Sequence, residues 1–325
     1  MKRKLFSAML GAFALLLLMG AASVPTQPAA ALLAEEESAV LSNTALETEA
    51  QSLDTQFTQA VEAATGIDPT EAAVPVSASG TLSINGQPAP QSLNQRNVQN
   101  TTYVALAAMA QALTPYAKCD WDGSTMTITT DRLSLTAKVG QLYVEANGRY
   151  LYIPEQVQLD EAGQVSVPLR TAAKAFDARV DYDGATAAIT VTSGSGAIVP
   201  GDSFYNQGDL FWLSRVIYRE SGNQSLEGQM AVGNVVLNRV ADPTPAFPNT
   251  VEEVLAQKNQ FSTYASGVLR KTEPSPSSII AAKLVMDGGV VEETRGALYF
   301  DSKANSWAAR NKQLITTFGG HNFYG

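Results

Sequence analysis

The spacing of apolar residues in the last third of the chain predicts two consecutive helices. The first runs from Asp209, a plausible N-cap, to Gly222, a natural helix stop, and one face carries Leu210, Leu213, Val216 and Ile217. The second begins near Ser225, which can cap it. From Gln229 to Val240 this second stretch is apolar on almost every side, and we therefore expect it to be buried.

The middle of the chain contains an internal repeat. Thr102–Leu113 matches Ser166–Phe176, and each copy is followed by a second similar pair, Cys119–Ile128 and Val180–Ile189. Each unit predicts an Ala-rich helix, a strand, an Asp-Gly turn and another strand. Between the copies, Leu133–Ile153 alternates in the manner of further strands, with Asn147-Gly148 as a hairpin signal. Trp121 and Tyr182 hold equivalent repeat positions, where we expect core packing, with ligand stacking as the alternative.

The chain begins with a basic triplet, Lys2-Arg3-Lys4, followed by an apolar stretch, Leu5–Gly20. This predicts a secretory signal peptide over residues 1–31, and an uncleaved membrane anchor is the alternative. Residues 32–78 contain nine acidic side chains and no Lys or Arg, which is typical of a solvated linker. Residues 194–202, rich in Gly and Ser, predict a second, flexible linker.

Two rare residue types exclude much chemistry. The chain has one cysteine, Cys119, and one histidine, His321, so that neither an intrachain disulfide nor a His-rich metal site can form. We therefore expect no metal and no cofactor. The net charge of −9 arises largely in residues 32–78. The region from Ser203 onward carries eleven charges of each sign, and no nucleic-acid partner is expected.

Glu220 is the carboxylate placed best for catalysis. It falls in the last turn of the first predicted helix, where the helix dipole disfavours a negative charge and an apolar wall would raise its pKa further. A carboxylic acid kept protonated near neutrality can serve as a general acid toward a glycosidic oxygen. The alternative is a solvated helix end, with Glu220 paired to Arg219 or Arg215. On the second helix, Asn234 and Asn238 share a face near Gln229 and require partners or a cleft.

Two families are identified by motifs. The pattern "VPLR…A…F.A.VDYD….I.V" at Val167–Val191 resembles the copper amine oxidase N-terminal-like domain. The stretch from Phe211 to Tyr324 resembles the SleB-type cell wall hydrolase domain of spore cortex-lytic enzymes. It carries, in order, "IYRESGNQSLEGQMAVGNVVLNRV", "FPNTVEEVL…QFS", "GALYF" and "GGHNFYG". No copper or oxidase chemistry follows from the first name, because this chain lacks the three histidine ligands and the Asn-Tyr dipeptide.

The second resemblance implies a lysozyme-like fold that acts on peptidoglycan glycan strands, with Glu220 as the catalytic glutamate. Many family members have Ala-Arg-Gly-Glu after that residue, where this chain has Ser221-Gly222-Asn223-Gln224, so local substrate contacts can differ. Trp307 is expected to stack on sugar rings or to lie in the core. Glu227 is expected to help position Glu220 without contacting the substrate itself. The residues expected to bind substrate are Gln229, Asn238, Gln260, Ser262, Asn305, His321 and Tyr324.

With one clearly placed carboxylate, the substrate can supply its own nucleophile. The muramyl 6-hydroxyl would attack the anomeric carbon, which makes the protein a lytic transglycosylase that cleaves between N-acetylmuramic acid and N-acetylglucosamine. A water-using muramidase, with Glu227 as second carboxylate, and a catalytically silent wall-binding or spore-coat structural protein are the alternatives. A regulatory protein partner is conceivable, but the sequence does not identify one.

The sequence therefore predicts an α+β multidomain protein, secreted to the cell wall or spore envelope and monomeric. A repeat α+β scaffold domain occupies residues 79–193, and a mainly helical, lysozyme-like domain occupies residues 203–325.

Overall fold

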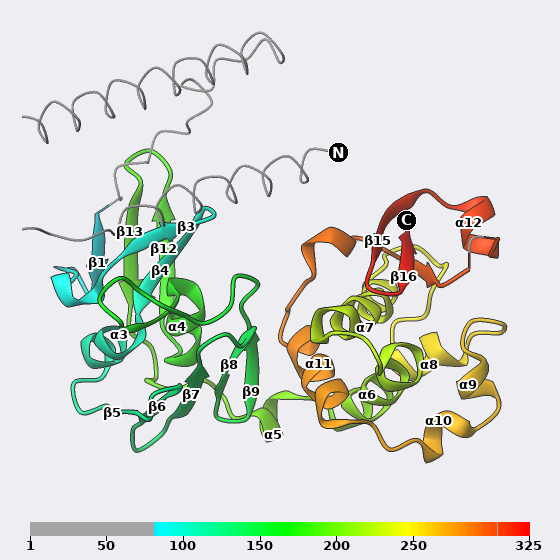
Figure 1. Ribbon diagram of the computed structural model, residues 1–325, viewed down its shortest axis with the longest axis horizontal. Coiled ribbons are helices and arrows are strands. Elements are labelled where there is room, and N and C mark those ends of the chain that lie inside the picture. The colour runs from blue at the N-terminus through cyan, green and yellow to red at the C-terminus, as the bar shows by residue number, and fades with distance from the viewer. Residues whose placement is uncertain (1–80, 304) are drawn as a thin grey trace, which may run out of the picture. The chain divides into compact units, whose positions relative to one another are not determined.

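Strands dominate the first half of the described chain and helices the second half (Figure 1). The computed structural model describes residues 81–303 and 305–325; the predicted signal peptide and acidic linker lie outside these residues. Two hydrophobic cores form, one from buried side chains between Leu82 and Ile198 and the other between Trp212 and Phe323. None of the helices in the described ranges is long and apolar enough to span a bilayer.

The largest sheet of the first half is a five-stranded antiparallel meander. Its strands follow the chain in order: β5 (Lys118–Trp121), β6 (Thr125–Thr129), β7 (Ser134–Lys138), β8 (Tyr143–Ala146) and β9 (Arg149–Tyr152). Asn147 and Gly148 connect β8 to β9 with φ angles of 50° and 76°. Positive φ at both central residues is the geometry that a two-residue hairpin with a type I′ turn requires. The predicted hairpin is confirmed.

Two smaller sheets complete this half. One has the order β12 (Arg179–Asp183), β13 (Ala188–Thr192), β1 (Leu82–Ile84) and β2 (Gln87–Pro88), with β1 parallel to β13. The other has the order β10 (Gln158–Leu159), β11 (Val165–Pro168), β4 (Thr101–Ala105) and β3 (Arg96–Val98). Helices α3 (Leu106–Leu113) and α4 (Leu169–Ala175) follow β4 and β11 directly. Each repeat copy thus has the predicted order of helix, strand, turn and strand.

The segment after β13 is held in place, contrary to the flexible linker that its glycines and serines predict. The Ile198 amide donates to the Ala175 carbonyl at 3.0 Å, and the Ile198 side chain is only 5% exposed. The Gly201 amide donates to the Asn147 carbonyl at 2.8 Å. A Cβ at Gly194 would lie 1.9 Å from the Asp177 carbonyl oxygen, so glycine at this position permits close packing rather than mobility.

The expectation that Trp121 and Tyr182 lie in the core is wrong. Their side chains are 42% and 59% exposed. Both residues sit on the outer hairpin strands β5 and β12, whose burial pattern is largely solvent-facing. The apolar side chains of the partner strands β6 and β13 fill the core instead.

Three helices form the centre of the second half: α6 (Gln207–Ser221), α7 (Leu226–Val240) and α11 (Pro276–Met286). They pack against one another, and Figure 1 shows them side by side. A Cβ at Gly233 of α7 would lie 2.9 Å from the Ile217 side chain of α6, so a glycine there lets the two helices approach closely. Asn206, rather than the predicted Asp209, caps α6, because its side chain accepts hydrogen bonds from the Gly208 and Asp209 amides.

Short elements surround these helices. The helices are α5 (Gly201–Phe204), α8 (Val251–Ala256), α9 (Ser262–Ala265), α10 (Val268–Lys271) and α12 (Trp307–Asn311). A three-stranded antiparallel sheet has the order β14 (Tyr299–Asp301), β16 (His321–Tyr324) and β15 (Leu314–Phe318). This half of the chain is therefore mainly helical with a small sheet, in agreement with the predicted character of the second domain.

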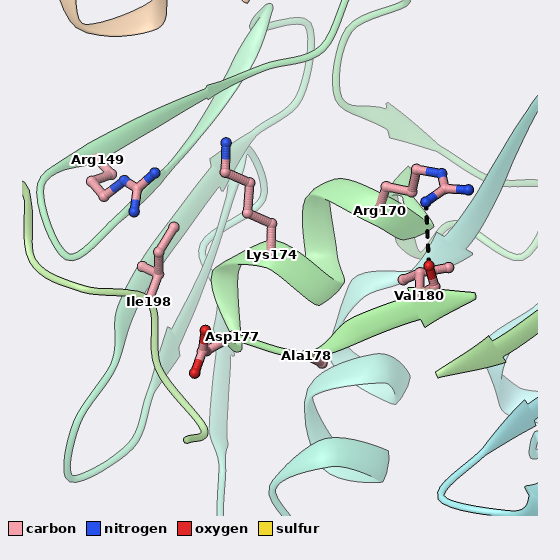
Figure 2. A pocket seen from close by; sticks show the side chains of 7 residues that line it. All are labelled: Arg149, Arg170, Lys174, Asp177, Ala178, Val180 and Ile198. Atoms are coloured by element: carbon pink, nitrogen blue, oxygen red, sulfur yellow. Dashed lines mark hydrogen bonds between the residues drawn. The ribbon is translucent and has the colours of Figure 1, made fainter. Parts of the chain in front are cut away.

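A buried ionic network joins elements of both halves. The Asp287 carboxylate, at the end of α11, receives hydrogen bonds from Arg149 of β9 and from the Tyr205 hydroxyl, and it lies 2.7 Å from the Lys174 ammonium. Figure 2 shows the side chains of Arg149 and Lys174 in the cavity that they line. In addition, Tyr143, Tyr150 and Tyr152 of β8 and β9 pack against the second hydrophobic core.

Candidate active site

Glu220 lies in the last turn of α6, as predicted. Burial raises the pKa of its carboxyl group above the ordinary value, while the neighbouring Arg219 cation and the Thr263 hydroxyl oppose the rise. Among the ion pairs found in those residues, none involves Glu220. The helix end is therefore a partly buried acid with an elevated pKa rather than a solvated salt bridge.

Glu220 opens into a cleft of about 750 Å³. The loop before α9, the end of α7, strand β14, the start of α12 and the start of β16 form its walls. The other residues that line it are Arg239, Lys258, Asn259, Gln260, Phe261, Tyr299, Phe300, Asp301, Ser302, Lys303, Ser306, Trp307, Ala308 and His321. The cleft combines aromatic faces with charged and amide groups, and carbohydrate sites have this composition because sugar rings have both apolar faces and hydroxyl edges.

His321 is in the cleft, as expected for a substrate-binding residue, and is 8% exposed. Its Nδ1 lies 3.3 Å from Nε2 of Gln224, and its ring packs edge-on against Phe300. Burial lowers the pKa of His321, and Asp301 opposes this shift, so the ring is mainly neutral at neutral pH. Gln224 also accepts a hydrogen bond from the Gly320 amide at 2.7 Å. Gln224, one of the four positions at which this chain departs from the family pattern, therefore holds the loop that carries His321.

A second carboxylate, Asp301, lies in the same cleft, and the sequence had not singled it out. One of its oxygens accepts the Ser306 hydroxyl, and the other accepts the Lys303 amide at 3.1 Å. The Ser306 hydroxyl oxygen in turn accepts the Ala309 amide at 2.9 Å and so caps α12. Because α12 begins at Trp307, Asp301 fixes the start of the helix that carries this tryptophan.

Trp307 is 56% exposed and lines the cleft. Of the two alternatives for this residue, the core position is therefore excluded. Its ring centroid lies 5.6 Å from that of Tyr299, and Lys312 contacts both rings. An exposed indole supported by a second ring provides a flat surface on which a pyranose ring can stack.

The polar line on α7 does not face the cleft, which corrects the roles expected for Gln229 and Asn238. Gln229 is 2% exposed, and its amide donates to Gln224 and Ser277 while its oxygen accepts from Ser278. Asn238 donates to the Ala297 carbonyl at 2.9 Å. Asn234 bonds the Gly289 carbonyl and the Val291 amide. Asn234 and Asn238 thus hold neighbouring backbone against the buried helix, whereas Gln229 bonds mainly to the serines at the start of α11, and the requirement for partners is satisfied without a ligand.

Glu227 does not line the cleft that contains Glu220. Its carboxylate accepts a hydrogen bond from the Tyr152 hydroxyl at 2.7 Å, and it lines a different cavity from Glu220, next to β9 and the loop after α11. The structure thus corrects the expected supporting role. The first turn of α7 faces the strand-rich half, so Glu227 is neither a partner of Glu220 nor its second carboxylate.

The remaining residues expected to bind substrate divide into two groups. Gln260 is exposed and lines the cleft. Ser262 and Asn305 are exposed but do not line it. Tyr324 is 4% exposed within the sheet, where its backbone pairs with β14 and β15, and unlike His321 it does not line the cleft. Phe261, between Gln260 and Ser262 in sequence, is 5% exposed and packs in the second hydrophobic core.

Arg239 and Tyr299 are cleft residues that the sequence reasoning missed. Arg239 stands in the last turn of a helix whose other residues are largely apolar, and an arginine in a buried stretch was the available signal. Tyr299 belongs to the motif "GALYF", whose individual residues the sequence does not assign to a role.

Comparison with known proteins agrees with the two motif regions. Residues 223–324 match the family described as Cell Wall Hydrolase, and residues 83–191 match the Copper amine oxidase N-terminal domain. A spore cortex-lytic enzyme of Bacillus cereus is 33% identical over 123 residues, covering 37% of this chain and 45% of that protein. The spore cortex-lytic enzyme of Bacillus subtilis is 28% identical over 130 residues, 39% of this chain and 40% of that protein.

Among solved structures, the catalytic domain of the germination-specific lytic transglycosylase SleB from Bacillus anthracis is 32% identical. The match covers 39% of this chain and 100% of the SleB catalytic-domain chain, with a TM-score of 0.34. The match to the curated relatives spans less than half of their own length. The family match begins at residue 223, just after Glu220. Residues 223–324 are therefore similar to the Cell Wall Hydrolase family and to spore cortex-lytic enzymes, and residues 83–191 are similar to the Copper amine oxidase N-terminal domain.

Proposed function

We propose that this protein degrades peptidoglycan by cleaving the glycan strand between N-acetylmuramic acid and N-acetylglucosamine. The observation that carries the proposal is Glu220 in an aromatic-walled cleft, with a pKa raised mainly by burial. Such a carboxyl group retains its proton at a pH where an exposed glutamate has lost it, and a general acid requires this property. The similarity to spore cortex-lytic enzymes supports the substrate class.

In the proposed reaction, Glu220 donates its proton to the glycosidic oxygen as the bond between that oxygen and the anomeric carbon breaks. The carboxylate then accepts the proton of the muramyl 6-hydroxyl, whose oxygen forms the new bond to the same carbon. The products are a 1,6-anhydromuramyl end and a free 4-hydroxyl, and no water is consumed. One carboxylate serves as acid and then as base, so this lytic transglycosylase route requires no second one.

Asp301 supports a second candidate, a water-using muramidase, because it is a carboxylate in the same cleft. Its contacts favour a positioning role instead: both of its oxygens accept hydrogen bonds from the loop before α12. We therefore favour the transglycosylase route. Glu227, in its separate cavity, does not enter either scheme.

The proposal is tested by digesting purified peptidoglycan sacculi with the full-length protein and analysing the released fragments by mass spectrometry. Release of fragments with 1,6-anhydromuramyl ends, each one water lighter than the hydrolytic product, is expected. Release of reducing ends alone would replace the transglycosylase by the muramidase. Binding to sacculi without release of fragments would favour a structural wall-binding protein.

A further inference from the structure

Arg239 is a buried cation in the wall of the cleft. It stands in the last turn of α7 and is 4% exposed, yet it lines the cavity that contains Glu220. Its Nε donates to the Leu298 carbonyl at 2.6 Å. Its Nη1 is buried and has no hydrogen-bond partner within residues 81–303 and 305–325. A guanidinium group has five N–H donors, and only the Nε donor of Arg239 forms a hydrogen bond found within the described residues.

The charge of Arg239 has no anionic partner either. In the described parts of the chain, its guanidinium forms no ion pair with a carboxylate. Instead it is surrounded by the rings of Phe247, Phe261 and Tyr299, whose centroids lie 5.1, 5.5 and 5.2 Å from its central carbon. Burial lowers the pKa of Arg239 to about 10, so it remains protonated at neutral pH. Aromatic faces offset only part of the free energy of burying a charge.

We propose that Arg239 binds a carboxylate of the substrate, on or attached to the muramic acid unit next to the cleaved bond. This inference rests on the proposed function and specifies its substrate recognition. A planar guanidinium group pairs with a carboxylate through two parallel hydrogen bonds. A peptidoglycan strand offers that group in two forms: the lactyl carboxylate of a muramic acid without peptide, and the carboxylates of a stem peptide. N-acetylglucosamine has neither, so Arg239 distinguishes the two sugars of the strand.

The first experiment measures binding of single sugars to the full-length Glu220→Gln protein by NMR titration. N-acetylmuramic acid should bind roughly tenfold more tightly than N-acetylglucosamine, because a hydrogen-bonded ion pair is the difference between them. The additional change Arg239→Gln should abolish this preference. The additional change Arg310→Gln, which removes an exposed charge of the same domain, should preserve it. Equal binding of the two sugars, or a preference that survives Arg239→Gln, would overturn the proposal.

Arg239→Gln can fail to fold, because the residue also holds the Leu298 carbonyl. The side-chain N–H signals of Arg239 in the Glu220→Gln protein provide a measurement that leaves this residue intact. They should shift when N-acetylmuramic acid is added and remain unchanged with N-acetylglucosamine. The absence of such a shift at saturation would equally overturn the inference.

The source of the carboxylate is determined by comparing sacculi with strands from which an amidase has removed the peptides. If the lactyl carboxylate is bound, Arg239→Gln should lose more activity on the stripped strands. If a stem-peptide carboxylate is bound, it should lose more on intact sacculi. Should the wild type release no fragments while the sugar preference persists, the proposed function fails and the carboxylate site stands. Should it release fragments without the preference, only the carboxylate site fails.

Discussion

The guanidinium group of Arg149 donates two hydrogen bonds to the carboxylate of Asp287, from Nε at 2.9 Å and from Nη2 at 2.7 Å. The two side chains are 8% and 1% exposed, and they come from positions 138 residues apart. The chain is folded back so that the sheet of the first half supplies the partner of an acid in the second half. The Arg149–Asp287 pair is therefore one of the contacts through which each half depends on the other.

We expect Asp287→Asn to destabilise the protein by about 3–5 kcal/mol, because it leaves the buried Arg149 without its counter-charge. Thermal unfolding followed by circular dichroism measures the effect. The matched control is Asp181→Asn, which removes an exposed pair with Arg179 and should change the melting temperature very little. Equal melting temperatures for the two variants would show that the buried pair contributes nothing.

The same pair predicts a loss of stability in acid. Burial alone would raise the pKa of Asp287, but the hydrogen bonds and charges of Arg149 and Lys174 outweigh it and hold the pKa below the ordinary value. The unfolded chain therefore binds this proton at a higher pH than the folded protein. The stabilisation is complete above the unfolded pKa and is lost as the pH falls through the folded pKa. The acid-induced loss of stability should be smaller in Asp287→Asn than in the wild type.

Glu220→Gln should abolish cleavage of sacculi while leaving the fold and wall binding intact. The amide retains the size of the side chain but cannot deliver a proton. Loss of a general acid costs about 10²- to 10⁴-fold in rate, and more where the group also acts as base. Fragment release from dye-labelled sacculi measures the rate. Glu293→Gln, an exposed position outside the cleft, is the control, and comparable rates in both variants would exclude Glu220 from catalysis.

The raised pKa of Glu220 has the opposite consequence for stability. In the folded protein this group holds its proton to a higher pH than it does in the unfolded chain. The folded state therefore loses relative stability as the pH rises through the folded pKa. Glu220→Gln removes this cost, so it should melt at a higher temperature than the wild type at neutral pH, with the gap narrowing as the pH falls below the ordinary carboxyl pKa. A gap that is independent of pH would contradict this explanation.

Asp301→Asn distinguishes the two catalytic routes. If Asp301 only positions α12, the variant should still yield 1,6-anhydromuramyl ends, at a rate reduced by less than about tenfold, since the amide retains one acceptor oxygen for Ser306. Mass spectrometry of the digest provides the measurement. If the wild type instead yields reducing ends and Asp301→Asn yields none, Asp301 is the base that activates water.

Trp307→Ala should weaken binding of glycan fragments roughly tenfold, because the free energy of aromatic stacking and the burial of one sugar face are lost. Trp307→Phe should restore part of the affinity. Titration of the Glu220→Gln protein with chitin-type oligosaccharides measures this, with Tyr116→Ala as the control, an aromatic side chain 91% exposed in the other half. An unchanged affinity in Trp307→Ala would show that the sugar does not stack on Trp307.

The features that could be predicted from the sequence were those with a local cause. Periodicity located α6 and α7, the Asn147-Gly148 turn was specified by its own two residues, and Glu220 could be placed at a helix end. Contacts between distant segments had no local signal. Asn234 and Asn238 have side chains of the kind that bind ligands, yet whether such amides bond to a sugar or to backbone depends on where residues 289–298 cross α7. Asp301 and Arg239 line the cleft only because β14 and α7 pack side by side, and the sequence around each residue does not predict this packing.

The tyrosines of β8 and β9 have one further consequence. Tyr143, Tyr150 and Tyr152 belong to the strand-rich half by backbone pairing, but they pack against the core of the helical half. A fragment cut at residue 203 would lose that wall and expose apolar surface to water. The two cores therefore share part of their free energy of folding, and heating should melt residues 81–325 in a single cooperative calorimetric transition. We therefore expect that the domain boundary predicted near residue 203 does not separate two parts that unfold independently.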